Sequence, residues 1–418
     1  MQGLGVSLSE PPRYQSIDVV RGVAVLGILT MNMASFAMIP PATFNPLAAE
    51  PTGAGDVALH AVNLILFDGR MRGLFAMLFG ASMLLMAERN EAAGIDPGGA
   101  HLARMAWLLV FGLAHLYLLW HGDILHHYAL VGLLAFLLRD LRVPALLIVG
   151  ALLYIVQLWI GSATPRAVAL AQAGLPDSAS AAAVLARIER SFGTPASADI
   201  ATWNAAFRDG GYGAALAQRW AEHRWTPLLA LLFQSFDTLA LMLWGMAAYR
   251  SGLLTGDWPR RRYRRWAMIG FGVSIVPALL LAGWLIATRY ALYPVTSATM
   301  LLSPVVRVPM IVGWACLMVA FALAGGALAA RFAAVGRMAF TNYIATSLIC
   351  TTIFYGYGLG LYGRVDRLGQ FGIMLSIWLA LLAFSPWWLT RFRYGPLEWL
   401  WRSLATRKLA PFIASDTH

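Results

Sequence analysis

The sequence predicts an all-α fold: a polytopic transmembrane helical bundle of about ten membrane helices, with both termini in the cytoplasm. Of the 418 residues, 59% are hydrophobic and 12% are charged, and the mean hydropathy of +0.66 is too high for a soluble protein. Apolar runs of about 18 to 25 residues recur along the chain, and a helix of that length crosses the hydrocarbon core. Basic residues gather at alternate connections between these runs, a pattern typical of multi-pass membrane proteins.

The chain contains ten such runs, which we predict to be membrane helices over residues 19–38, 70–87, 102–119, 124–138, 143–161, 227–249, 266–288, 305–328, 338–357 and 371–389. The first run begins just after Asp18, contains Arg21 near its start and is too long for a cleaved signal peptide. We therefore expect it to be retained as the first helix.

Arginine distinguishes the two sides of the predicted membrane. The net charge is +11, with 31 basic residues of which only Lys408 is a lysine. Basic residues follow every second span, at Arg89 and Arg104, Arg139 and Arg142, 250–265, Arg331 and Arg337, and 391–408. Two of the opposite loops, 40–55 and 121–123, contain none. Because basic loops stay in the cytoplasm, we expect a multi-pass protein of the cell (inner) membrane. Basic and aromatic residues do not alternate along a soluble face, so nucleic-acid binding is not expected.

The predicted spans divide the chain into three parts. Residues 1–161 form an N-terminal membrane half of five helices, and residues 226–418 form a C-terminal half of five with a short cytoplasmic tail. Between them, the extracytoplasmic loop 162–225 contains two helix-like segments, 178–190 and 212–223. We favour an amphipathic cap on the membrane surface for this loop, and a substrate-specific lid is the alternative.

A polar cluster interrupts the apolar sequence at residues 120–128. Asp123 and His127 are four residues apart and would share a helix face, whereas His126 lies about 100° away. A carboxylate bonded to one imidazole nitrogen leaves the other nitrogen as a base, so Asp123 with His127 or His121 is the candidate catalytic group. The alternative is that these histidines are merely solvated at the membrane boundary.

A second charged segment opens the second predicted span. Asp68, Arg70 and Arg72 lie within five residues there. Asp68 and Arg72 could pair across one helical turn and cap the helix. In the other interpretation, the three line the same outer pocket as Asp123 and bind substrate together with His126.

The densest basic cluster consists of Arg250, Arg260, Arg261, Arg262, Arg264 and Arg265. A cytoplasmic anchor is the simpler explanation. The alternative is a binding site for a polyphosphorylated cofactor, since guanidinium groups bind phosphate bidentately.

Other patterns indicate no further site. GLGLYG at 358–363 matches a dinucleotide-binding pattern but follows a membrane helix instead of a strand. Cys316 and Cys350 lie in apolar runs without a metal-ligand spacing, so neither a disulfide nor a metal site is expected.

Several motifs resemble the YeiB-type family of integral membrane proteins. They are SIDVVRGVAVLGIL at 16–29 with Asn32, LF at 74–75 with LFG at 78–80, GDIL at 122–125 with YA at 128–129, GY at 211–212 with Arg219, GM at 245–246 with RSG at 250–252, GRMA at 336–339, TNY at 341–343 and GPLEWLWR at 395–402. The resemblance covers nearly the whole chain.

That family is similar in outline to the transmembrane acyltransferase superfamily, which includes heparan-α-glucosaminide N-acetyltransferase. The shared outline is about ten helices and the opening Asp18, Arg21 and Gly22. The resemblance implies transfer of an acyl group from cytoplasmic acyl-CoA to an acceptor on the far side. One departure is that the superfamily's histidine near the outer end of the first helix is absent, and Asn32 is present in that region.

We therefore expect a membrane acyltransferase that uses acyl-CoA as donor and a hydroxyl or amine of a cell-surface sugar or lipid-like molecule as acceptor. Asn32, Asn342 and Tyr343 are further candidate substrate-binding residues, and the arginine cluster would hold CoA phosphates. The alternative is a transporter or flippase for a small or lipidic solute, with the same charges as a relay. A structural or regulatory membrane protein is a third interpretation. The bilayer is the expected partner, and a homodimer is compatible with the sequence without being indicated by it.

Overall fold

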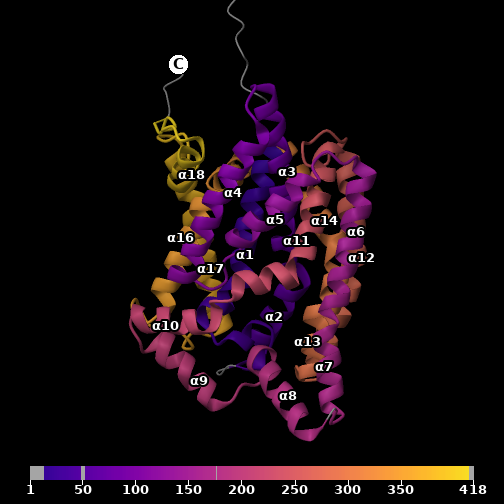
Figure 1. The fold of residues 1–418 in the computed structure, drawn as a ribbon, viewed down its shortest axis with the longest axis vertical. Helices are drawn as coiled ribbons and strands as arrows, with labels where there is room; N and C mark the ends of the chain where they lie inside the picture. The colour runs from indigo at the N-terminus through magenta and orange to yellow at the C-terminus, as the bar shows by residue number, and fades with distance from the viewer. Residues whose placement is uncertain (1–13, 49–51, 176, 414–418) are drawn as a thin grey trace, which may run out of the picture.

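A computed structural model describes residues 14–48, 52–175 and 177–413. Over these ranges the chain forms helices and no β-strand, apart from an isolated bridge between Phe392 and Ile413. The predicted all-α bundle is confirmed (Figure 1).

The ten predicted membrane helices are all present. They are α1 Gln15–Ala37, α3 Arg70–Ala92, α4 Pro97–Ala114, α5 Leu125–Leu137, α6 Val143–Gly161, α11 Thr226–Arg250, α12 Arg260–Ala287, α14 Ser303–Ala324, α16 Ala339–Phe354 and α17 Arg367–Leu389. Within the described residues, eight helical segments are long and apolar enough to cross a membrane. The shorter α5 and α16 have 13 and 16 residues.

Short helices fill the connections. In the long loop, the predicted segments 178–190 and 212–223 correspond to α8 Ser178–Phe192 and α10 Tyr212–His223. Six more helices were not expected as separate elements: α2 Ala54–Leu66, α7 Ala163–Gln172, α9 Ser197–Trp203, α13 Leu292–Ser297, α15 Ala327–Arg337 and α18 Pro396–Thr406. α7 to α10 form a cap at the lower end of the bundle in Figure 1, and α18 lies at the upper end.

The predicted span 305–328 is too long at its C-terminal end. α14 stops at Ala324, where Gly325 has a φ of 75° and turns the chain. The next helix, α15, packs closely along α1. A Cβ on Gly336 would lie 1.9 Å from the carbonyl oxygen of Asp18, so this approach of two backbones requires glycine.

The two ends of the bundle differ in charge as the arginine pattern predicts. The start of α1 lies beside the turn between α11 and α12, because the Ser16 hydroxyl donates to the Leu254 carbonyl at 2.7 Å. α18 packs on α4, where the Trp401 indole donates to the Arg104 carbonyl at 2.9 Å. The cap therefore lies at the end opposite to these arginine-rich connections (Figure 1). Which end faces the cytoplasm stays a prediction.

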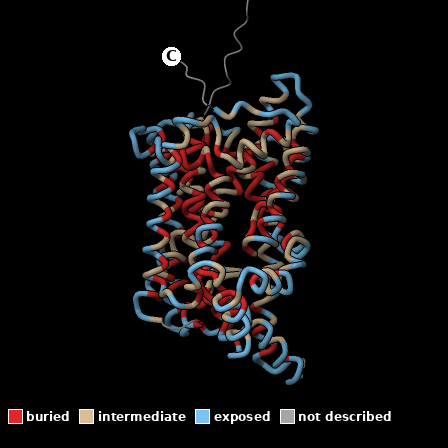
Figure 2. Tube along the Cα trace, turned by 90° about the vertical axis from the view of Figure 1, so that its left-hand side faces the viewer, coloured by how far each residue is buried: buried red, intermediate tan, exposed pale blue. Residues whose placement is uncertain are grey.

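Apolar side chains cover the outside of the bundle as well as its interior. Figure 2 shows buried residues along the centre of the molecule and exposed ones along its outer faces. Leu152 on α6, Leu280 on α12 and Leu379 on α17 are 58%, 71% and 67% exposed. A surface of this kind suits contact with lipid, so polar groups inside the bundle need partners from the protein itself.

Candidate functional site

Asp123 lies deep in the bundle, just before α5. The 13 residues of α5 extend it by about 20 Å at a rise of about 1.5 Å per residue. The hydrocarbon core is about 30 Å thick, so a helix of this length covers only about two thirds of it. The Asp123 side chain is also fully enclosed, with 0% exposure. Asp123 therefore lies at the start of the fourth helix, with its side chain enclosed by the protein instead of exposed at a membrane boundary.

Asp123 accepts hydrogen bonds from two histidines. Its Oδ2 is 2.6 Å from His115 Nδ1, and its Oδ1 is 2.7 Å from His126 Nδ1. Oδ1 also accepts the backbone N–H of His126 at 2.9 Å, which satisfies a free donor at the start of α5. Because an ionised carboxylate only accepts, Nδ1 of each imidazole is the donor and Nε2 carries no proton when the ring is neutral. Neither Nε2 has a hydrogen-bond partner among the described residues.

The predicted pair of Asp123 and His127 is wrong. Residues four apart share a face only within one helix, and Asp123 precedes the first residue of α5. His127 Nε2 instead lies 3.0 Å from the Thr238 hydroxyl. His121 does not contact Asp123 either: it lies 3.3 Å from the Ser35 hydroxyl and stacks on His223, with ring centroids 4.5 Å apart.

His115 is the functional candidate that the sequence reasoning missed. It begins a π-helical turn, η3 His115–Leu119, which ends α4, and π-turns are frequent at functional sites. Tyr343 lies beside it, with ring centroids 5.2 Å apart, and its hydroxyl lies 3.3 Å from both the Gly122 carbonyl and the Ile124 amide. The sequence could have indicated it, because His115 lies inside the predicted span 102–119. Burying a histidine in a membrane costs free energy unless it has a polar partner.

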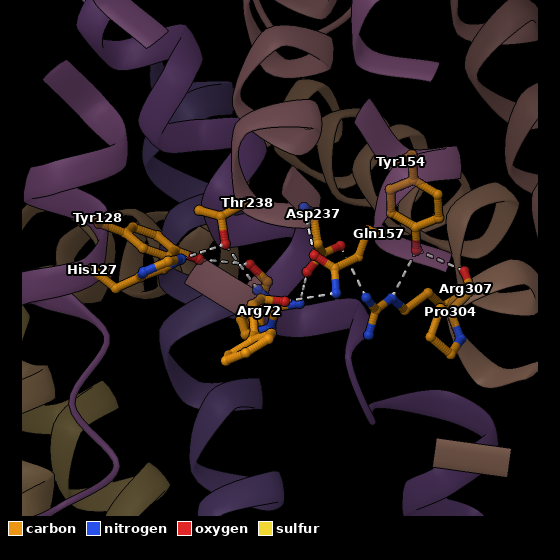
Figure 3. Close-up of polar contacts among 10 residues, drawn as sticks. Arg72, His127, Tyr128, Tyr154, Gln157, Asp237, Thr238, Pro304 and Arg307 are labelled. Carbon is orange, nitrogen blue, oxygen red and sulfur yellow. Dashed lines mark hydrogen bonds and ion pairs between the residues drawn. The ribbon is translucent and has the colours of Figure 1, made fainter. Parts of the chain in front are cut away.

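A second polar cluster joins four helices (Figure 3). Asp237 of α11 binds Arg72 of α3 through Oδ2 and Arg307 of α14 through Oδ1, the latter at 3.0 Å. Tyr154 of α6 accepts from Arg307 Nε at 3.2 Å, and Gln157 accepts the Asp237 amide at 3.3 Å. We call Arg72, Asp237 and Arg307 the charged triad. It carries one positive charge in excess, and Arg72 remains 25% exposed.

Thr238 connects the charged triad to α5. Its hydroxyl lies 3.4 Å from Arg72 Nη1 and 3.0 Å from His127 Nε2. The Tyr128 hydroxyl donates to the Arg72 carbonyl at 3.1 Å (Figure 3). His127 also directly follows His126, and their ring centroids are 6.4 Å apart. The triad and the Asp123 cluster therefore reach α5 at two adjacent residues, His127 and His126.

The segment from Asp68 to Arg72 does not form the predicted capping pair, because Arg72 turns inward to Asp237. Arg70 caps the end of α2 instead, donating from Nη1 to the carbonyls of Leu64 at 2.6 Å and Asp68 at 2.8 Å. This segment passes close to the triad. Gly69 has a φ of 67°, and a Cβ there would lie 2.5 Å from Nη1 of Arg307.

Asn342 and Asn32 lie in different surroundings. Asn342 is fully buried and donates to the Val335 carbonyl and the Ser385 hydroxyl, both at 3.1 Å, so it links α16 to α15 and α17. Asn32 is half-buried on the face of α1 that carries Ser35, three residues on, and Ser35 contacts His121. Asn32 therefore shares a helix face with a residue that contacts His121.

The arginines at the start of α12 are exposed at the end of the bundle away from the cap. Arg260 donates to the Leu323 carbonyl at 2.8 Å, and Arg262 lies 3.6 Å above the Trp258 ring. Arg250, at the end of α11, donates to the Leu141 carbonyl. Arg261, Arg264 and Arg265 are also exposed. This cluster is separate from Asp123 and open to an anion or to lipid headgroups.

Comparison with known proteins gives relatives of nearly the same length. Residues 248–408 match a family model described as "Protein of unknown function (DUF418)". The chain is 34% identical over 415 residues to the uncharacterized protein YeiB of Escherichia coli (strain K12), covering 97% of this chain and 99% of that protein. It is 30% identical over 436 residues to the uncharacterized protein YxaH of Bacillus subtilis (strain 168), covering 97% of each. No solved structure matches the chain. Identity at this level over whole lengths establishes that the chain belongs to the YeiB family.

Proposed function

We propose that the protein is a membrane-embedded acyltransferase. The observation that carries this proposal is the contact of Asp123 with His115. Asp123 Oδ2 accepts only the His115 ring, whereas Oδ1 is shared between the His126 ring and backbone amide. A carboxylate that fixes Nδ1 as the donor leaves Nε2 as a base, the arrangement that activates a hydroxyl or an amine.

His115 is therefore the proposed catalytic base, in place of His127 or His121. Its Nε2 takes the proton of the acceptor hydroxyl or amine while the acceptor atom attacks the thioester carbonyl of an acyl-CoA. The carbon–sulfur bond then breaks, and the proton passes from His115 to the leaving thiolate. Asp123 stabilises the imidazolium that exists between these two transfers.

The charged triad supplies positive charge beside the base. Two guanidinium groups face one carboxylate inside the bundle, and Arg72 retains accessible surface. Surplus positive charge in a site of low polarity stabilises the oxyanion that develops at the thioester carbonyl. The exposed arginines at the start of α12 are the proposed binding site for CoA phosphates, because they lie at the end that the charge pattern assigns to the cytoplasm.

A transporter is the second candidate, and the charged triad is the observation that favours it. Ionised groups inside a membrane bundle mark proton relays and substrate sites as well as catalytic centres. In that case, the purified protein in liposomes would move a solute along a proton gradient and would not release thiol from acyl-CoA.

The deciding experiment is thiol release from acyl-CoA by the detergent-purified protein, together with equilibrium binding of acyl-CoA. We expect saturable binding in the wild type and in His115→Ala, and loss of thiol release in His115→Ala alone. His101→Ala is the matched control, because His101 is also buried and, within the described part of the chain, bonds to the Gly132 carbonyl at 3.1 Å and stacks on Phe136 but bonds to no carboxylate. Absence of saturable acyl-CoA binding to monodisperse wild-type protein would refute the proposal.

A further inference from the structure

Arg219 on α10 is buried without a counter-charge. Its exposure is 0%, and its one hydrogen bond to a described residue runs from Nη1 to the Tyr117 carbonyl at 2.9 Å. Among the described residues, Nε and Nη2 have no hydrogen-bond partner, and no carboxylate lies within 4.0 Å of the guanidinium. A guanidinium stays charged at any physiological pH, so its burial without an anion is costly.

The nearest acid on the same helix is engaged elsewhere. Glu222 Oε1 accepts from Arg190 at 2.7 Å and from the Trp203 indole and the Gln218 amide at 3.0 Å each. The carboxylate therefore balances Arg190 and does not neutralise Arg219.

The two nitrogens without partners form one edge of the guanidinium. Nε–H and one N–H of Nη2 point the same way as adjoining donors on a rigid, planar fork, which matches two oxygens of a carboxylate or phosphate. This edge is the one that binds such groups bidentately, whereas Nη1 is already used by Tyr117.

The histidines near Arg219 are held in the neutral form and do not balance its charge. Burial lowers the pKa of His223 to about 4, and the charge of Arg219 lowers it further. Burial, His223 and Arg219 together hold the pKa of His121 well below its ordinary value. The charge of Arg219 also acts on the hydroxyls of Tyr355 and Tyr357, which are further donors.

The site adjoins the proposed catalytic base. Tyr117, which Arg219 binds, lies in the same π-turn as His115. α10 is fastened to that turn by two further bonds, from the Tyr212 hydroxyl to the Leu118 carbonyl at 2.8 Å and from the Tyr117 hydroxyl to the Arg224 carbonyl at 3.0 Å. A group held by Arg219 therefore lies between the cap and the turn that carries His115.

We propose that Arg219 is a binding residue for an oxyanion, a phosphate or carboxylate group of the molecule that enters beneath the cap. This inference rests on the proposed function in one respect: if acyl transfer occurs, the acceptor is anionic and is oriented by Arg219 toward His115. The binding of the anion itself requires neither acyl-CoA nor turnover.

The test is the thermal stability of the purified protein in neutral detergent with inorganic phosphate or acetate, at constant ionic strength set with chloride. We expect phosphate or acetate to raise the melting temperature of the wild type and not that of Arg219→Gln. Arg187→Gln is the matched control, since it removes the same charge from an exposed position in the cap. The same melting temperature measured in phosphatidylcholine nanodiscs, with and without phosphatidylglycerol, distinguishes the two sources of the anion. An increase with phosphatidylglycerol indicates a lipid headgroup, and an increase with phosphate or acetate alone indicates a soluble anion.

Arg219→Lys keeps the charge and a donor for the Tyr117 carbonyl but loses the planar pair of donors. It therefore tests the same contact if Arg219→Gln fails to fold. We expect its affinity for the oxyanion to fall about tenfold or more. Equal stabilisation of wild type, Arg219→Lys and Arg219→Gln by every probe, or stabilisation of none, would overturn the inference. Oxyanion binding without thiol release would refute the acyltransferase proposal alone, and thiol release without oxyanion binding would refute this inference alone.

Discussion

Replacing Asp123 by asparagine should abolish the activity while largely preserving the fold. The carboxylate accepts three hydrogen bonds, at 2.6, 2.7 and 2.9 Å. An asparagine has one carbonyl oxygen, and its NH₂ can only donate, so one imidazole must change its tautomer. If that imidazole is His115, Nε2 becomes protonated and can no longer act as the base. General-base catalysis contributes about 10²- to 10⁴-fold, and we expect thiol release to fall by that factor.

The Asp123→Asn substitution should lower the free energy of unfolding only moderately. Loss of a hydrogen bond to a charged group lowers the free energy of unfolding by about 1.5–3 kcal/mol. Asp56→Asn is the matched control, because Asp56 is also buried and accepts only backbone N–H groups, from Gly53 and Arg367, both at 2.7 Å. The assay is thiol release from acyl-CoA by monodisperse protein, beside a thermal melt. Activity of Asp123→Asn near that of the wild type would remove Asp123 and His115 from the mechanism.

Four further outcomes are expected. Asp237→Asn leaves two guanidinium groups facing each other inside the bundle, and the free energy of unfolding should fall by about 3–5 kcal/mol in a denaturation series; a change below about 1 kcal/mol would contradict this. Gly336→Ala should be destabilising by about 1–3 kcal/mol or more, whereas Gly272→Ala, where a Cβ meets nothing within 4 Å, should match the wild type. A Ser178→Cys variant in a cysteine-free background should react with an impermeant thiol reagent in intact cells, and labelling only after membrane rupture would reverse the topology. Neutralising three arginines within 260–265 should weaken acyl-CoA binding and its dependence on salt, and unchanged affinity would make the cluster an anchor only.

The membrane helices could be predicted because each depends on its own composition. A run of apolar residues must form a helix in lipid whatever its neighbours do, since its backbone has no other partners. α15 could not be predicted in this way. It is short, and it can pack along α1 only because Gly336 has no side chain. The sequence of α15 alone does not show that α1 approaches it at this glycine.

The site was predicted in part. Asp123 and Arg72 were identified from the local sequence and Tyr343 from a family motif, but their partners His115, Asp237 and Gly122 lie on other helices or turns. His126 was also identified, and its partner Asp123 is three residues away. Spacing within one segment cannot show which distant residue a side chain meets, and it failed for His127 because the helix starts two residues after Asp123. A simpler rule would have served better.

That rule is to mark every ionisable residue inside a predicted span. Asp237, Arg307 and His115 each lie within one of the ten runs, and each proves to be bonded to a residue of another helix or turn. In a membrane protein an isolated charge in an apolar run identifies a contact even when its partner is unknown.

The shortness of α5 affects how the protein is made. Its 13 residues, which include His126 and His127, are fewer than the roughly 20 that a single helix needs to remain in the membrane unaided. We therefore expect α5 to enter the bilayer as a hairpin with α4, and His127 to gain its Thr238 contact only after α11, about a hundred residues later, has been synthesised. Substitutions at this contact should thus reduce the amount of protein that accumulates in the membrane, in addition to any effect on the finished fold.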